Sequence, residues 1–166
     1  LKGHHINRIY YAIAIGNFRE DEGTVDAPIG RHPVDRKKMA VIRNTELRAR
    51  EAVTHWRVLA RGEADGQNFT LVRCELETGR THQIRVHMTH VGFPLVGDPA
   101  YGGRFRIPPA VNPTLLETLK AFPRQALHAR FLELEHPTTG KRIKWEAPLP
   151  DDFTWLLTLL RQDREA

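Results

Sequence analysis

The densest group of side chains able to do chemistry lies at residues 77–87, with the sequence ETGRTHQIRVH. This stretch holds two arginines, Arg80 and Arg85, together with two histidines and a glycine. Guanidinium groups beside the free N–H groups of a helix start bind anions such as an RNA phosphate or a carboxylate. The same residues would equally suit a well-capped helix with surface arginines, so their spacing by itself leaves both interpretations open.

Three histidines in and after this stretch, His82, His87 and His90, raise the question of a metal site. Their spacings differ from the His-x-x-x-His pattern of a helical zinc site, and no carboxylate stands out beside them as a further ligand. We therefore predict no metal ion, and a metal-dependent hydrolase built on these histidines is kept as an alternative. Serine is absent from the chain, which excludes a Ser-His-Asp enzyme, and both glycine-rich nucleotide loops are absent too.

The positive charge of the chain is concentrated in one segment. The formal net charge is +5, from 25 Lys and Arg against 20 Asp and Glu. Residues 31–50 hold seven basic and two acidic side chains, which accounts for the whole excess. Clustered Lys and Arg bind nucleic acid by displacing the counterions of its phosphates. The segment therefore points to RNA as a partner, and a solvated, disordered loop is the alternative.

Hydrophobic periodicity predicts an α+β scaffold that positions these groups. The predicted strands are 8–15, 53–60, 69–77, 126–135 and 142–146, and the predicted helices are 81–91, 113–120 and a segment capped by Asp151. Residues 17–29 read as loop with at most a short strand. Gly79 falls at a strand-to-helix corner, where we expect it to adopt a backbone conformation that other residues resist. The single cysteine, Cys74, alternates with charged residues in its strand and is predicted to be a small core residue rather than a nucleophile.

Length and composition limit the class of protein further. The chain has 166 residues, 40% of them hydrophobic, which suits one domain with a buried core. No apolar stretch is long enough to span a membrane, one cysteine cannot form an intramolecular disulfide, and no secretory signal is present. We therefore expect a cytoplasmic protein without a membrane partner. Because the chain begins with Leu1 and not with Met, we expect it to be a piece of a longer protein.

The stretch 77–103, ETGRTHQIRVHMTHVGFPLVGDPAYGG, resembles the signature of the RluA/RluD family of ribosomal large-subunit RNA pseudouridine synthases. Further segments similar to that family are 6–16, 28–41, 52–56, 124–129 and the pair His136-Pro137. The resemblance implies the α+β catalytic domain of the family, with a mixed, mainly antiparallel sheet flanked by helices. It also implies an enzyme that uses no cofactor and no metal.

The reaction implied by the resemblance detaches the uracil of a flipped uridine from its ribose and reattaches it through carbon, in large-subunit ribosomal RNA. Tyr10 would pack against the flipped base and take part in removing the C5 proton, and Arg85 would pair with a nucleophilic aspartate. Leu127 would line the uracil pocket. The resemblance assigns RNA contacts to Arg80, Thr81, His82 and Gln83, and to Arg31, Arg36, Lys37 and Lys38 of the basic segment.

The chain departs from the family in one decisive respect. The nucleophilic aspartate of the family stands in a His-Arg-Leu-Asp motif upstream of the Tyr10 strand, and that motif does not occur in these 166 residues. The N-terminal S4-type RNA-binding domain of many relatives is also absent, and Asp98 matches a structural position. We therefore expect residues 1–166 to be a partial catalytic domain, incomplete at its N-terminal side and inactive alone. Such a piece should be marginally stable, or associate with itself or another chain. A non-catalytic RNA-binding protein is the alternative.

Overall fold

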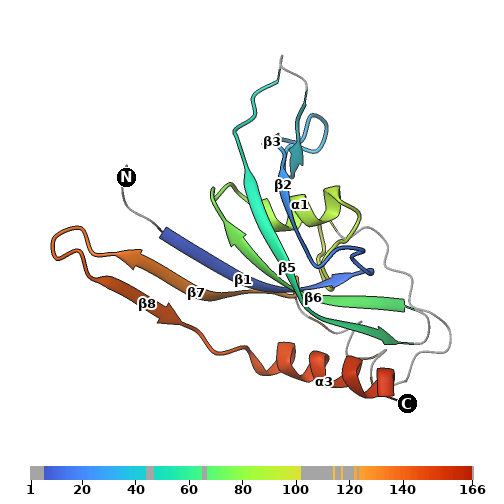
Figure 1. Ribbon diagram of the computed structural model, residues 1–166. Helices are drawn as coiled ribbons and strands as arrows, with labels where there is room; N and C mark the ends of the chain where they lie inside the picture. Colours follow the sequence, from blue (N-terminus) through green and yellow to red (C-terminus); the bar gives the residue numbers. More distant parts are fainter. Residues whose placement is uncertain are drawn as a thin grey trace.

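The computed structural model describes residues 6–43, 47–64, 67–101, 114, 117, 122 and 124–165. The strands are β1 Ile6–Ile15, β2 Glu22–Asp26, β3 Ile29–Arg31, β4 Met39–Val41, β5 Val53–Ala64, β6 Gln67–Leu76, β7 Leu127–Glu135 and β8 Arg142–Glu146, and the helices are α1 Gln83–His90 and α3 Asp151–Glu165. Six strands form one sheet in the order β2-β5-β6-β1-β7-β8, while β3 and β4 form a separate hairpin (Figure 1). Every one of these pairings is antiparallel.

The α+β class predicted from the sequence is confirmed. All the predicted strands are present, and β2 is the short strand that the interpretation of 17–29 allowed. The helix predicted at 81–91 begins at Gln83, and the one predicted at 113–120 lies outside the described residues except for Thr114 and Glu117, which are both helical. Among the described residues, no helix is long and apolar enough to cross a membrane.

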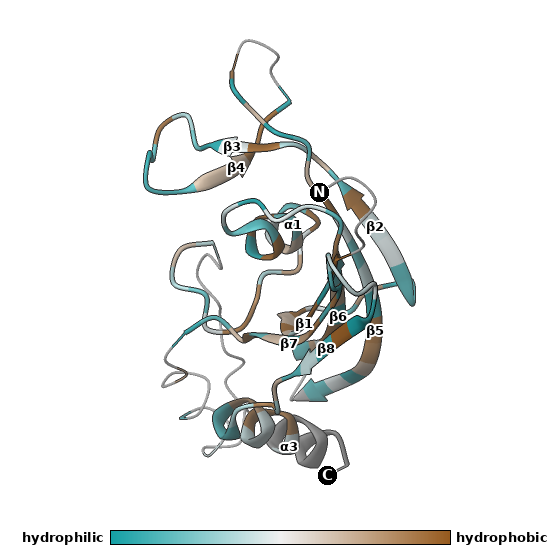
Figure 2. Ribbon diagram, turned by 90° about the vertical axis from the view of Figure 1, so that its left-hand side faces the viewer, coloured by the Kyte–Doolittle hydropathy of each residue, from teal (hydrophilic) through white to brown (hydrophobic). Residues whose placement is uncertain are grey.

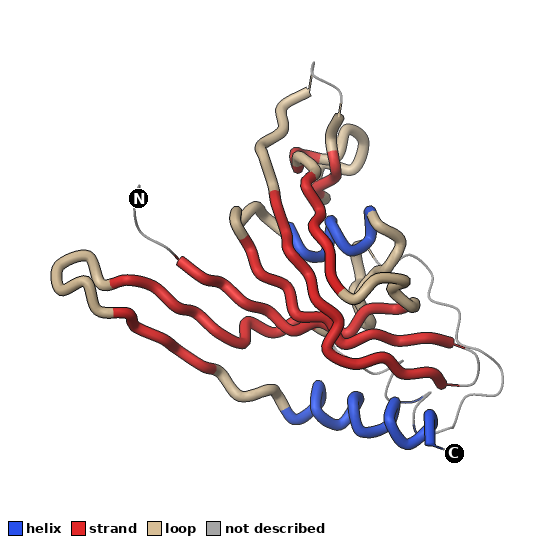
Figure 3. Tube along the Cα trace, in the orientation of Figure 1, coloured by secondary structure: helices blue, strands red, loops and turns tan. Residues whose placement is uncertain are grey.

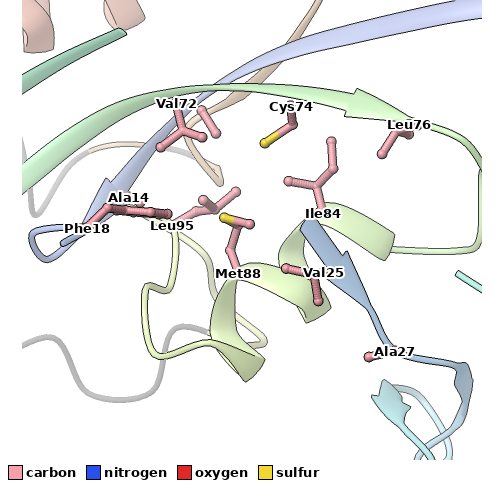
Figure 4. Packing of buried hydrophobic residues seen from close by; sticks show 11 residues of the cluster. Ala14, Phe18, Val25, Ala27, Val72, Cys74, Leu76, Ile84, Met88 and Leu95 are labelled. Carbon is pink, nitrogen blue, oxygen red and sulfur yellow. The ribbon is translucent and has the colours of Figure 1, made fainter. Parts of the chain in front are cut away.

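One face of the large sheet is covered by α1. Residues directly opposite each other in register share a face, so Trp56, Cys74 and Tyr10 form one row across β5, β6 and β1. Figure 4 shows Ile84 and Met88 of α1 directed toward the strand that carries Cys74. Burial raises the pKa of the Cys74 thiol to about 12. The prediction of a core residue is confirmed, because a thiol that stays protonated is a poor nucleophile.

The opposite face of the sheet is covered by α3. Phe153 and Leu156 of this helix are fully buried and pack with Phe69 of β6. The sequence predicted Asp151 as the helix cap, but Asp151 is already the first residue of α3. The cap position falls one residue earlier, at Pro150, whose carbonyl accepts a hydrogen bond from the amide of Thr154 over 3.0 Å.

The basic segment begins with the β3–β4 hairpin, which lies beside α1 (Figure 2). Ile29 of β3 is buried together with Val86 of α1, and Met39 and Val41 of β4 pack against them. These apolar anchors hold the hairpin in place, so the alternative of a disordered loop for the basic segment is wrong for residues 31–41. The turn of the hairpin, residues 32–38, carries the exposed charges.

Candidate active site

The side chains of Arg85 and Asp98 form a buried ion pair between α1 and the loop that follows it. Nε of Arg85 donates to Oδ2 of Asp98 over 3.0 Å, and Nη2 donates to Oδ1 over 2.9 Å. The exposed fractions of the two side chains are 10% and 0%. Two parallel hydrogen bonds of this kind fix the plane of the guanidinium as well as its position.

The carboxylate of Asp98 is fully engaged by protein groups. Its Oδ1 also accepts hydrogen bonds from the amides of Ala100, at 2.9 Å, and Tyr101, at 3.0 Å. Burial raises the pKa of Asp98, but the hydrogen bonds from Arg85 and the two amides outweigh burial, so the pKa lies below its ordinary value. Asp98 is therefore a structural carboxylate, as its place in the motif implied, and not a free nucleophile.

Arg85 keeps hydrogen-bond donors that Asp98 does not use. A guanidinium has more N–H donors than one carboxylate accepts, and Nη1 of Arg85 has no acceptor among the residues that the structure describes. The hydrogen bond to Asp98 raises the pKa of Arg85 despite its burial. A permanently charged guanidinium with spare donors can serve a second anion. The predicted pairing of Arg85 with a nucleophilic aspartate stays a prediction.

Tyr10 and Leu127 lie next to each other on the α1 face of the sheet. Ala12 is directly opposite Leu127, and Tyr10, two positions earlier in β1, is opposite Ala129. Both Tyr10 and Leu127 pack against the core that α1 covers. The register of β1 and β7 shifts between Ile9 and Tyr10, and such irregularities redirect side chains beside binding sites. The two residues that the resemblance assigned to a uracil pocket are thus neighbours.

The side chain of Gln83 is buried at the corner between β6 and α1 and hydrogen-bonds to both sides of it. Its Oε1 accepts from Oγ1 of Thr78, at 2.7 Å, and from the amide of Arg80, at 3.0 Å. Its Nε2 donates to the carbonyl of Val53 and to Oγ1 of Thr54, both at 3.0 Å. Because the side chain is 3% exposed and all its hydrogen-bonding positions are used, Gln83 positions this corner. Its predicted contact with RNA stays a prediction.

The unusual backbone at this corner belongs to His82 and not to Gly79. Among the described residues, His82 is the only one other than glycine with a positive φ, at 57°, and Gly79 has none. Gly79 instead leaves space for Arg8: a Cβ at this position would overlap Nη1 of Arg8, so this side chain would have to move. Burial, followed by the charge of Arg85, lowers the pKa of the exposed His82 imidazole. The expected role of Gly79 is thereby corrected from backbone freedom to space for an arginine.

The remaining predicted RNA contacts divide between two surfaces. Thr81 is exposed at the start of α1, and Nε of Arg80 donates to the carbonyl of Glu51 over 2.7 Å. On the hairpin, Nη1 of Arg31 donates to the carbonyl of Arg36 over 3.1 Å and so closes the turn. The other basic side chains of this turn are Arg36, Lys37 and Lys38, the first two exposed and the third half-buried. The contacts of these side chains with RNA stay predictions.

His87 is a core residue rather than a metal ligand. It is fully buried, with Nδ1 2.8 Å from Oγ1 of Thr54 and Nε2 2.8 Å from the carbonyl of Ala27. A carbonyl only accepts, so Nε2 carries the proton and Nδ1 accepts from the threonine. No group of three or more His, Cys, Asp or Glu side chains able to hold a metal occurs within the described ranges.

Sequence reasoning missed two residues of this region. Arg8 stands two positions before Tyr10 in β1, and the two-residue period of a strand could have placed it on the same face. Its buried Nε has no hydrogen-bond partner in the part of the chain that the structure describes. Thr54 links Gln83 to His87, and no local signal distinguishes it, because these partners are 29 and 33 positions away.

The chain is similar in sequence to a family of RNA-modifying enzymes. A family profile described as RNA pseudouridylate synthase matches residues 1–90. Over 166 residues the chain is 63% identical to a Pseudomonas aeruginosa protein named ribosomal large subunit pseudouridine synthase D, a match that covers 100% of this chain and 49% of that protein. A protein of the same name from Escherichia coli K12 is 47% identical over 165 residues, covering 99% and 48%. The chain therefore spans about half the length of these curated relatives.

Two solved human structures have a similar fold. Human RNA pseudouridylate synthase domain containing 1 superimposes with a TM-score of 0.68 at 27% identity, covering 87% of this chain and 55% of the other. For human RNA pseudouridylate synthase domain containing 4 the TM-score is 0.67 at 28% identity, with coverages of 94% and 62%. The fold that the resemblance implied is confirmed.

Replacing Asp98 with asparagine should destabilise the protein by about 3 kcal/mol at pH 7, because it leaves the Arg85 charge buried without its partner. The lowered pKa of Asp98 sets the pH dependence: its contribution is present above the ordinary value of 3.8 and is lost as the pH falls below it. Urea unfolding of the two proteins at several pH values measures this. Asp26→Asn, at an exposed position, is the control and should change the free energy of unfolding by less than about 0.5 kcal/mol. An equally small change for Asp98→Asn would contradict the importance of the pair.

Acid should destabilise the protein through His87. Burial lowers the pKa of its imidazole below the ordinary value of 6.5, so the unfolded chain binds a proton there before the folded one does. The stability is therefore fully present above pH 6.5 and decreases below it, by at most about 1.4 kcal/mol per pH unit for this residue. Urea unfolding between pH 5 and 7, with NMR titration of the His87 ring, measures both quantities. A His87 ring that titrates in the folded protein at or above the ordinary value of 6.5 would refute the assignment.

Proposed function

The chain belongs to the RNA pseudouridylate synthase family, and from this premise we propose that it forms the C-terminal part of the catalytic domain of an enzyme that isomerises uridine to pseudouridine in large-subunit ribosomal RNA. The names of its bacterial relatives support the choice of RNA. The proposed enzyme acts in the cytoplasm and needs neither a cofactor nor a metal ion.

The observation that carries this proposal is the geometry of Arg85. Asp98 holds the guanidinium in a fixed plane, and Nη1, which has no acceptor among the described residues, is suited to another anion. An ionised carboxylate beside a permanent positive charge has a lowered pKa and stays available as a nucleophile at neutral pH. Arg85 is therefore suited to hold the nucleophilic aspartate, which in this proposal comes from the upstream part of the enzyme.

The neighbouring side chains suit the other requirements of the reaction. Tyr10 and Leu127 lie side by side on the α1 face of the sheet, where an aromatic ring and an aliphatic side chain can enclose a flipped uracil. Flipping a base out of its stack costs a few kcal/mol, and contacts with the RNA backbone offset this cost. We assign those contacts to the hairpin turn with Arg36, Lys37 and Lys38, and to Arg80 at the start of α1.

An exposed apolar surface supports the view that the chain is part of a larger catalytic domain. Leu132 is opposite Arg8 in β1 and opposite Trp145 in β8, so the three share the face that carries Tyr10. Leu132 and Trp145 are 36% and 51% exposed, and Ile6 nearby in β1 is 38% exposed. Figure 3 shows this end of β1, β7 and β8 extending away from both helices. Adjacent exposed apolar groups indicate a surface that another element covers, and we assign it to the upstream part.

The proposed function predicts that residues 1–166 alone have no turnover, whereas a chain extended upstream through a His-Arg-Leu-Asp motif is active. Release of tritium from RNA labelled at uridine C5 measures the reaction.

In the extended chain, Arg85→Lys keeps the charge but loses the paired hydrogen bonds, and kcat should fall about 100-fold. Tyr10→Phe keeps the ring and loses the hydroxyl, and its effect on kcat should exceed that of Tyr11→Phe, on the opposite face. Pseudouridine formed by the 166-residue chain alone would refute the assignment of the nucleophile.

Neutralising the hairpin turn should weaken RNA binding and its dependence on salt. In the extended chain, we replace three side chains together: Arg36→Gln, Lys37→Gln and Lys38→Gln. The negative slope of log K for RNA binding against log salt concentration should become shallower by up to about three units. The control is Arg57→Gln with Arg73→Gln, two arginines on the face opposite Tyr10, which should change the slope by less than about one unit. Titration of labelled RNA between about 50 and 200 mM salt gives both slopes. Equal slopes for the hairpin variant and the unchanged enzyme would exclude the hairpin as an RNA contact.

A further inference from the structure

The side chain of Tyr101 joins three parts of the molecule that are distant in sequence. Its hydroxyl oxygen lies 2.9 Å from the amide nitrogen of Met39, in β4, and 2.7 Å from Nδ1 of His82, at the start of α1. The centroid of its ring lies 4.9 Å from Cζ of Arg85. One tyrosine therefore contacts the basic hairpin, the helix start and the candidate catalytic arginine at once.

The contact with Met39 fixes the hairpin turn. Met39 is the first residue of β4 and directly follows Lys38, the last residue of the basic turn. Met39 is opposite Arg31 in a pair that exchanges no hydrogen bonds, so its amide faces away from β3 and donates to the Tyr101 hydroxyl. The turn that carries Arg36 and Lys37 cannot move away from α1 without breaking this bond. Figure 2 shows the hairpin and α1 next to each other.

The contact with His82 stabilises a backbone conformation that a residue with a side chain rarely adopts. The φ of His82 is 57°, in the left-handed region, and its side chain makes no capping hydrogen bond to the helix. The imidazole instead bonds to the Tyr101 hydroxyl and packs edge-on against its ring, with the centroids 5.4 Å apart. Arg85 follows three residues later, so the position of its backbone depends on this helix start.

The hydrogen atoms at this junction can be assigned. The Met39 amide can only donate, so the Tyr101 oxygen accepts from it and has one proton to give. Burial and the neighbouring Arg85 charge lower the pKa of His82, which favours the neutral ring. The hydroxyl then donates to Nδ1 of His82, and the imidazole proton resides on Nε2, the nitrogen that Tyr101 does not use.

We propose that Tyr101 is a positioning residue that holds Arg85 in register with the basic hairpin, so that RNA bound by the hairpin meets the guanidinium in the reactive geometry. This proposal rests on the proposed function. Tyr101 also packs against Ile29 and Val86 in the small core under the hairpin, so the positioning role has to be separated from a role in packing alone. A phenylalanine would fill that core equally well and would lose both hydrogen bonds.

The test is Tyr101→Phe in the extended, active enzyme, with Tyr11→Phe as the matched control. Tyr11 packs edge-on against Phe131 on the opposite face of the sheet. We expect kcat of Tyr101→Phe to fall about tenfold, since small displacements of a reacting group cost this much or more, while KM for RNA changes less than about threefold. Tyr11→Phe should leave both unchanged. An unchanged kcat, or a loss confined to KM, would overturn the proposal.

Two measurements decide the physical link independently of activity. In Tyr101→Phe, hydrogen exchange at the Met39 amide should accelerate at least about tenfold, as expected when a protecting hydrogen bond is lost, while amides in β1 keep their rates. In the unchanged protein, the ¹⁵N chemical shifts of the His82 ring should identify the tautomer protonated at Nε2. Unchanged exchange at Met39 would overturn the link even if the enzyme proved inactive for another reason. If the unchanged enzyme makes no pseudouridine, the proposed function fails instead.

A second variant keeps the proposal falsifiable if Tyr101→Phe fails to fold. His82→Asn retains a residue that tolerates the left-handed conformation but removes the imidazole from the Tyr101 hydroxyl. By itself it should lower kcat about tenfold. Where Tyr101→Phe folds, the double variant should lose no more than about twofold beyond either single one, because both changes break the same connection. Losses that multiply in the double variant, or a normal kcat for His82→Asn, would overturn the proposal.

Discussion

The candidate site depends on one buried amide at the corner between β6 and α1. Gln83 uses both of its N–H donors and both acceptor positions of its carbonyl on protein groups. Moving this corner would leave a buried polar group unpaired, which costs more than a made hydrogen bond contributes. The left-handed backbone of His82 directly precedes Gln83, and Arg85 follows in the first turn of the helix. Both are therefore placed by the same constraint, and a catalytic guanidinium requires placement of this accuracy.

The ion pair of Arg85 with Asp98 contributes orientation more than stability. A buried pair often adds little over well-packed apolar groups, because removing two charges from water nearly cancels their attraction. Its geometry nevertheless restricts the guanidinium to one plane, and the ring of Tyr101 limits it from another side. The arrangement combines a permanent charge, a fixed orientation and donors that no described residue uses.

The two faces of the sheet differ in how completely helices cover them, and the exposed apolar surface lies on the face that α1 covers only in part. The face against α3 is a closed core around Phe69 and Phe153. The face against α1 carries Tyr10 and Leu127 and continues beyond the helix to Leu132 and Trp145. Leu132 and Trp145 are 36% and 51% exposed on this second face, and the proposed function assigns their cover to the upstream part of the enzyme.

The sequence alone determined the five long strands of the sheet, both described helices, the core position of Cys74 and the likeness to the family, because these depend on local periodicity and on motif order along the chain. It could not determine the turn structure of the basic segment, the left-handed backbone at His82 rather than Gly79, or the ion pair of Arg85 with Asp98. Those features depend on contacts between distant positions: Tyr101 is 62 residues from Met39, and Gln83 is 30 from Val53. Local patterns decide which elements form, whereas the satisfaction of buried polar groups, which only the folded chain can achieve, decides where the functional side chains lie.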